Sequence, residues 1–294
     1  MMYLSLSILF SSLIFVEFKF YTKYQIQTIF AIIVNYITAC IVGLLFYKER
    51  IDLISIPHKS WFWGGMALGL LFILIFNLIA VTSQRLGVSV ASVATKMSFT
   101  IPVLFGVFFF KEALGVLEIT GIILAFFAIY LTSTKANKIK AKKWALVLPV
   151  LVFLGSGIID TCIKYFQAVH MPEEEYALFS ACVFASAGIF GVLFIGFKSI
   201  NQPIKVNLKN IIGGICLGVP NYFSIFFLLK ALQHPTWNSA SVFTINNVAI
   251  VMFSTLLGIL LFKERLTIKN WFGIGMAVLS IVLVAFGQQL MNFL

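Results

Sequence analysis

Charge is scarce in this sequence. Charged residues make up only 11% of the 294 residues, and Asp and Glu together number 10. A soluble domain carries roughly 25% charged residues, so this composition excludes an ordinary water-soluble fold. Hydrophobic residues reach 61% and the mean hydropathy is +1.04. No soluble interior of this size buries so much apolar surface, and we therefore expect lipid to surround the chain.

The residues that usually carry catalysis or bind metals are also few. There is no HExxH pattern and no glycine-rich phosphate loop, and Gly155-Ser156-Gly157 lacks the spacing of a nucleophile elbow. No cysteine pair has CxxC spacing, and the cysteines fall in apolar segments, where they are expected to be small buried residues. We expect no catalytic residue, no cofactor and no metal site. The histidines and cysteines are His58, His170, His234, Cys40, Cys162, Cys182 and Cys216.

Apolar segments of spanning length fill almost the whole chain. A transmembrane helix needs about 20 residues, so about ten spans leave no room for a soluble catalytic domain. The first segment has no basic region before it and no small-residue cleavage site after it, so it is expected to be a retained span. The spans are predicted at 3–20, 26–47, 61–82, 87–110, 115–132, 145–165, 176–197, 210–231, 238–262 and 270–291.

Short motifs recur in the same order in the two halves, displaced by 148 to 152 residues. This spacing predicts a first five-helix repeat at 1–133, a basic linker at 134–143 and a second five-helix repeat at 144–294. The linker contains five of the lysines. The recurring motifs are Gly43–Phe46 with Gly191–Phe194, Gly64–Gly69 with Gly213–Gly218, Phe110–Glu112 with Phe262–Glu264, and Gly121 with Gly273.

An odd number of spans in each repeat makes the two copies enter the membrane from opposite sides. The predicted fold is therefore an all-α integral membrane protein of about ten transmembrane helices, arranged as two inverted five-helix repeats. This architecture is common among secondary transporters, which bind substrate near the midplane between the halves. The alternative is an old duplication that is retained only for packing.

The residues from Ile101-Pro102 to Phe110-Lys111-Glu112, followed by Leu117 and Gly121, resemble the EamA-like branch of the drug/metabolite transporter superfamily. The second copy, Leu261–Thr267 followed by Gly273, resembles the same pattern, but Ser254 stands where the family's proline is expected. The resemblance implies a ten-span carrier of small metabolites, often an exporter, with both termini in the cytoplasm. The positive-inside rule predicts the opposite orientation, because most Lys and Arg residues fall on the other side.

Lys96 is the most informative polar residue, because it lies close to the centre of the fourth span. A lysine at this depth is costly unless it faces a cavity or a partner. Helical spacing places a polar stripe on its span and a second stripe on span nine. We hypothesise that the stripes face each other and bind a polar or anionic substrate group; a purely structural lysine is the alternative. The hypothetical substrate-binding residues are Lys96, Ser92, Thr100, Asn247, Thr244, Ser241 and Asn77.

Two carboxylates at membrane depth are candidate proton carriers. Asp160 lies four residues before Lys164 in span six, and Glu17 lies near Lys19 in span one. Residues four apart share a helix face, so Asp160 and Lys164 can pair. A structural ion pair near the interface is the alternative role. The resemblance identifies Lys19 and Lys164 as the family's basic residues at the ends of these spans.

The remaining polar and proline residues have simpler interpretations. Pro102 and Pro220 should bend their helices, which suits a gate. Asparagines within spans more often join helices than bind ligands. Asn35, Asn221 and Gln84 are expected to join helices in this way. Glu112 and Glu264 lie at helix ends and are expected to be structural or gating residues.

We therefore expect a secondary active transporter that works by alternating access around a central cavity. Amino-acid-like solutes or organic anions are the candidate small polar substrates, and efflux is the expected direction. A lipid flippase or a channel is the alternative, and a membrane enzyme is a weaker one. The net charge of +11 indicates contact with anionic lipid headgroups rather than nucleic acid. The protein is expected in the plasma or inner membrane, as a monomer or homodimer.

Overall fold

The computed structural model describes residues 2–46, 54–110, 115–133, 144–169, 175–201, 207–232 and 239–291. These residues form α-helices and one short 3-10 helix, η1. The first half contains α1 (Met2–Tyr24), α2 (Thr28–Phe46), η1 (Ile56–His58), α3 (Phe62–Leu86), α4 (Val88–Met97), α5 (Thr100–Phe110) and α6 (Val116–Ser133). The second half contains α7 (Trp144–Val169), α8 (Tyr176–Asn201), α9 (Leu208–Leu232), α10 (Ser239–Phe262) and α11 (Ile268–Met291).

The described helices confirm the all-helical membrane architecture. Eight helical segments are long and apolar enough to cross a membrane, and Val116–Thr132 and Val147–Ile163 are two shorter apolar helices. Large apolar side chains such as Phe126, Phe194 and Trp271 are exposed on the outside of the bundle. This surface suits lipid, because the hydrocarbon core of a bilayer does not hydrate it.

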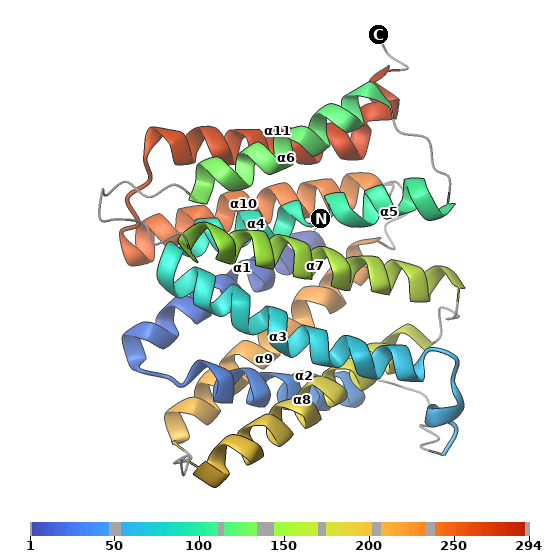
Figure 1. Ribbon diagram of the computed structural model, residues 1–294, viewed down its shortest axis with the longest axis vertical. Helices are drawn as coiled ribbons and strands as arrows, with labels where there is room; N and C mark the ends of the chain where they lie inside the picture. The colour runs from blue at the N-terminus through green and yellow to red at the C-terminus, as the bar shows by residue number, and fades with distance from the viewer. Residues whose placement is uncertain are drawn as a thin grey trace.

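The helices run side by side, and each half packs mainly on the other (Figure 1). Helix α2 packs along α9, α3 along α8, and α6 along α11. The first two pairs are equivalent under the inversion, since α8 corresponds to α2 and α9 to α3. The α1–α2, α3–α4 and α10–α11 connections lie at one end of the bundle, on the left of Figure 1, which we call the Gly87 face. The opposite end, where α11 finishes, is the terminal face.

The predicted fourth span is interrupted near its middle. Helix α4 ends at Met97 and α5 begins at Thr100, whereas the sequence predicted one helix over 87–110. Pro102 explains the break, because it has no N–H to donate to the carbonyl of Ser98, four residues earlier. The N–H of Ile101 donates to that carbonyl instead, at 2.9 Å. Helix α9 continues through Pro220. Pro102 therefore lies beside a break in its span, whereas Pro220 lies within an unbroken helix.

Candidate functional site

Lys96 lies in the last turn of α4, four residues before α5 begins at Thr100, and its side chain is partly exposed. It is eight residues after Val88, or about 12 Å along the helix. The charge of Asp160 on α7 interacts with that of Lys96. No ion pair joins these two described side chains. An oppositely charged pair that is near but unbonded leaves both groups able to contact a ligand.

Asp160 is exposed towards the interior of the bundle. The outward face of α7 carries exposed apolar residues, including Leu154 and Ile158. Asp160 comes two residues after Ile158, which places it about 200° around the helix. Its helical neighbours on that side, Phe153 and Ser156, are buried, but Asp160 itself is exposed. The accessible surface of this carboxylate therefore faces interior space and not lipid.

Ser98 connects Asp160 to the break in the fourth span. Its Oγ lies 3.1 Å from Asp160 Oδ2 and 2.6 Å from the carbonyl oxygen of Thr95. A serine hydroxyl has one hydrogen and can donate to only one of these acceptors at a time. A protonated Asp160 can donate to Ser98, whereas an ionised Asp160 must compete with Thr95 for the hydroxyl hydrogen.

Two buried hydroxyls, one on α5 and one on α7, lack a hydrogen-bond partner in the described part of the chain. Thr100 Oγ1, at the start of α5, and Ser156 Oγ, one turn before Asp160 on α7, accept and donate no hydrogen bond among the described residues. A buried polar group without a partner is costly, so such groups often mark a site for water or ligand.

The predicted stripes on α4 and α10 lie on neighbouring helices. Lys96 and Asn247 are each eight residues from the start of their helix, and these helices run antiparallel. They therefore lie on opposite sides of the midplane, and no hydrogen bond joins these two described side chains. Ser92 is fully buried and donates to the Ser89 carbonyl of its own helix. The side chains of Ser241 and Thr244 lie outside the described residues.

Glu17 is the second predicted proton carrier. Its Oε2 is buried and has no hydrogen-bond partner in the described part of the chain. Lys19 donates to the backbone oxygen of Gln84 at 2.9 Å, which ties α1 to the end of α3. The side chain of Lys164 is outside the described residues.

The predicted asparagines divide into two kinds. Asn221 on α9 donates to Asn35 on α2 at 3.1 Å, and both are buried, so this pair joins the two halves. Asn77 donates to the carbonyl of Ile73 in its own helix at 2.9 Å. This bond stays within α3, so a role of Asn77 in substrate binding remains a prediction.

Sequence reasoning missed Ser98 and Asn246. The available signal for Ser98 was its position four residues before Pro102, where the proline removes a helical hydrogen bond. Asn246 lies beside Asn247 but is buried, and it accepts a hydrogen bond from Ser7 of α1 at 3.1 Å. No sequence pattern marked Asn246, because a single position of register decides which of the two asparagines is buried.

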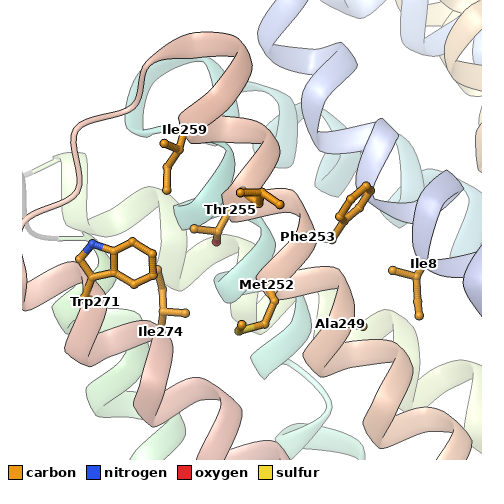
Figure 2. Close-up of a pocket in the computed structure, with 9 residues that line it drawn as sticks. Ile8, Ala249, Met252, Phe253, Thr255, Ile259, Trp271 and Ile274 are labelled. Carbon is orange, nitrogen blue, oxygen red and sulfur yellow. The ribbon is translucent and has the colours of Figure 1, made fainter.

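A cavity of about 430 Å³ lies between α1, α10 and α11 (Figure 2). Ile8 lines one side, Trp271 and Ile274 line the other, and the remaining residues come from α10. Thr255 is the polar residue of the lining, and its buried hydroxyl has no partner among the described residues. This cavity is apolar and shares no lining residue with the Lys96 and Asp160 site.

Comparisons with known proteins agree with this architecture. A protein of Haemophilus influenzae described as "Uncharacterized protein" is 30% identical over 252 residues, covering 83% of this chain and 84% of the relative. A solved structure described as "Crystal structure of protein" has a TM-score of 0.57 and 13% identity, covering 96% of this chain and 98% of that chain. At this identity the solved structure supports the fold alone.

A family model described as the EamA-like transporter family matches residues 143–286. The proteins of this family are transporters and not enzymes, which supports the expectation of a non-enzyme at the level of the family. The apolar helices and the family together show a multi-pass membrane protein. The chain therefore belongs to the EamA-like transporter family, within the drug/metabolite transporter superfamily.

Proposed function

We propose that this protein is a secondary active transporter of small polar metabolites, which works by alternating access around Lys96 and Asp160. The observation that carries the proposal is the pair of interior charges beside the break in span four. Charged groups within a membrane are costly and usually serve transport or proton relay. Discontinuous helices near the midplane are a common feature of carrier binding sites.

In this mechanism the Lys96 ammonium binds an anionic group of the substrate, such as a carboxylate. Thr100 and Ser156, whose buried hydroxyls lack partners among the described residues, supply hydrogen bonds to its polar atoms. Asp160 carries the coupling proton, because the single hydrogen of Ser98 cannot satisfy both Thr95 and an ionised Asp160. Glu17 is the second candidate carrier of this proton. Amino-acid-like solutes and organic anions fit this site.

The organisation proposed for the carrier follows from its repeat. Residues 1–133 and 144–294 form the two halves, joined by the basic linker 134–143. The equivalent helix pairs α2 with α9 and α3 with α8 support this division. Both halves must be present to form the site, since Lys96 comes from one and Asp160 from the other. We place the carrier in the plasma or inner membrane, exporting its substrate, as a monomer or homodimer.

Flux into or out of reconstituted proteoliposomes tests the proposal. Amino acids, nucleosides, sugars and organic anions are each assayed with and without an imposed pH gradient. Saturable flux whose KM rises in Lys96→Gln supports the carrier and its site. Saturable flux that is unchanged in a folded Lys96→Gln protein rejects the site. Linear, non-saturating flux of small ions would indicate a channel instead.

A lipid flippase is the second candidate, and the apolar cavity in Figure 2 is the observation that favours it. Its lining fits an acyl chain better than a polar metabolite. Fluorescent phospholipid analogues in the same vesicles separate the two functions. Lipid movement between leaflets that is sensitive to Met252→Trp and insensitive to Lys96→Gln would support the flippase.

A further inference from the structure

The carboxylate of Glu264, which follows α10, lies at the N-terminus of α4. Its Oε1 accepts the backbone N–H of Val88 at 2.8 Å, and its Oε2 accepts the hydroxyl of Ser89 at 3.3 Å. The first turn of a helix leaves N–H groups without helical partners and carries a partial positive charge. Glu264 therefore caps a helix of the first half with a charge from the second half.

The surrounding backbone is shaped to admit this carboxylate. Lys263 has a positive φ of 53°, and Gly87, just before α4, has φ of 120°. A Cβ added at Gly87 would lie 2.9 Å from Glu264 Oε1, and one added at Gly258 would lie 2.8 Å from Oε2. A non-glycine residue with positive φ is uncommon and marks a position held by its surroundings. The backbone at Lys263 and the absence of a Cβ at Gly87 and at Gly258 therefore all accommodate the contact of Glu264 with the start of α4.

Other contacts close the Gly87 face around the cap. Lys19 of α1 donates to the carbonyl of Gln84 on α3, and Ser83 of α3 donates to the carbonyl of Phe15 at 2.8 Å. The rings of Phe20 on α1 and Phe262 on α10 have centroids 4.8 Å apart. Helices α1, α3, α4 and α10 thus converge at this face. Ser89 and Ser92, which lie between it and Lys96, are 2% and 0% exposed.

We propose that Glu264 is the latch that holds the Gly87 face closed, and that its bond to Val88 breaks when the carrier opens to that side. The proposal rests on the alternating-access function proposed above, which requires each face to close and open in turn. The cap joins the C-terminal end of α10 to the N-terminal end of α4, so separating these helices must break it. The other charged contact at this face, from Lys19, joins α1 to α3. Between the ends of α10 and α4, the charge of Glu264 makes the bond to Val88 charge-assisted, and such bonds are roughly twice as strong as neutral ones.

Thiol accessibility tests the latch without relying on transport. Cys40, Cys162, Cys182 and Cys216 are replaced by Ala, and Ser92→Cys is introduced behind the cap. The protein in nanodiscs is reacted with a charged, membrane-impermeant maleimide. We expect Glu264→Gln to raise the labelling rate about tenfold. Weakening one charge-assisted hydrogen bond should raise the population of the conformation that is open at the Gly87 face by about this factor. Gly87→Ala, which crowds the same contact from the other side, should raise it as well.

Glu175→Gln is the matched control, since Glu175 is a carboxylate that joins two helices at the terminal face. It should leave labelling of the cysteine at position 92 unchanged. Unchanged labelling in a monodisperse Glu264→Gln protein would overturn the latch, as would an equal rise with Glu175→Gln. If labelling rises selectively but no solute shows saturable flux, the latch stands and the transport function fails.

Discussion

Gly69 and Gly218 occupy equivalent positions in the two halves, and each lies against the backbone of a helix from the other half. A Cβ at Gly69 of α3 would lie 2.7 Å from the amide nitrogen of Ala187 on α8. A Cβ at Gly218 of α9 would lie 2.7 Å from the carbonyl oxygen of Asn35 on α2. Small residues let membrane helices approach closely, so the repeated glycine motif specifies both interfaces.

We predict that Gly69→Ala and Gly218→Ala each destabilise the protein by about 1–3 kcal/mol, the usual cost of overpacking a close interface. The nearby atoms include backbone, which cannot turn aside as a side chain can. The midpoint temperature of thermal unfolding in detergent is the measurement. Gly275→Ala is the control, because nothing lies within 4 Å of its added Cβ. Equal effects at all three glycines would contradict this explanation.

Lys96→Gln should weaken substrate binding by about 10-fold to 100-fold, because it removes the charge-assisted hydrogen bond proposed between Lys96 and the substrate. Lys96→Arg keeps the charge and should retain part of the affinity. The KM for saturable flux in proteoliposomes is the measurement. A rise in KM for both variants alike would show that shape, and not charge, decides recognition at this position.

Asp160→Asn should abolish the stimulation of flux by a pH gradient while it leaves exchange of substrate across the membrane intact. The amide cannot gain or lose the coupling proton, yet it can still contact Ser98. Parallel measurement of gradient-driven flux and of substrate exchange separates the two effects. Glu17→Gln tests the other candidate carrier, and loss of stimulation only in that variant would transfer the coupling role to Glu17.

The contact at the terminal face should make stability depend on pH. Hydrogen bonds from Lys59, at 2.6 Å, and from Trp61, at 2.5 Å, hold the pKa of Glu175 below its ordinary value of 4.5. A lowered pKa in the folded state contributes stability that is present above the unfolded pKa and lost as the pH falls through the folded pKa. Glu175→Gln should therefore lower the unfolding temperature at pH 7.

The difference between Glu175→Gln and the original protein should disappear under acidic conditions, below the lowered pKa of Glu175. Lys59 is partly exposed, so solvent screens the interaction and the expected effect is small. Thermal unfolding across a pH series checks this sign. A difference that persists unchanged in acid would show that the contribution of Glu175 comes from packing and not from its charge.

The sequence determined the membrane environment, the number of spans and the inverted halves, because these depend on composition, hydrophobic length and repeated motifs. Lys96 and Asp160 could each be selected from the sequence, because a charged residue within a long apolar segment is easily recognised there. Their closeness could not be predicted, because they lie in different halves and no local pattern links them. The repeat alone could not place the stripes of Lys96 and Asn247 in space, because equivalent residues of inverted halves fall on opposite sides of the midplane, and a common site for the two stripes stays a prediction.

Only the tertiary structure decided which polar groups meet. The sequence indicated only a structural or gating role at a helix end for Glu264, and the structure shows that it caps α4 across 176 residues of chain. Asn246 and Asn247 are chemically identical neighbours, and the rotation of α10 against α1 buries one and leaves the other partly exposed. Hydrophobic length fixes where a helix crosses the membrane, but its rotation and its partners are set by packing between segments far apart in the chain.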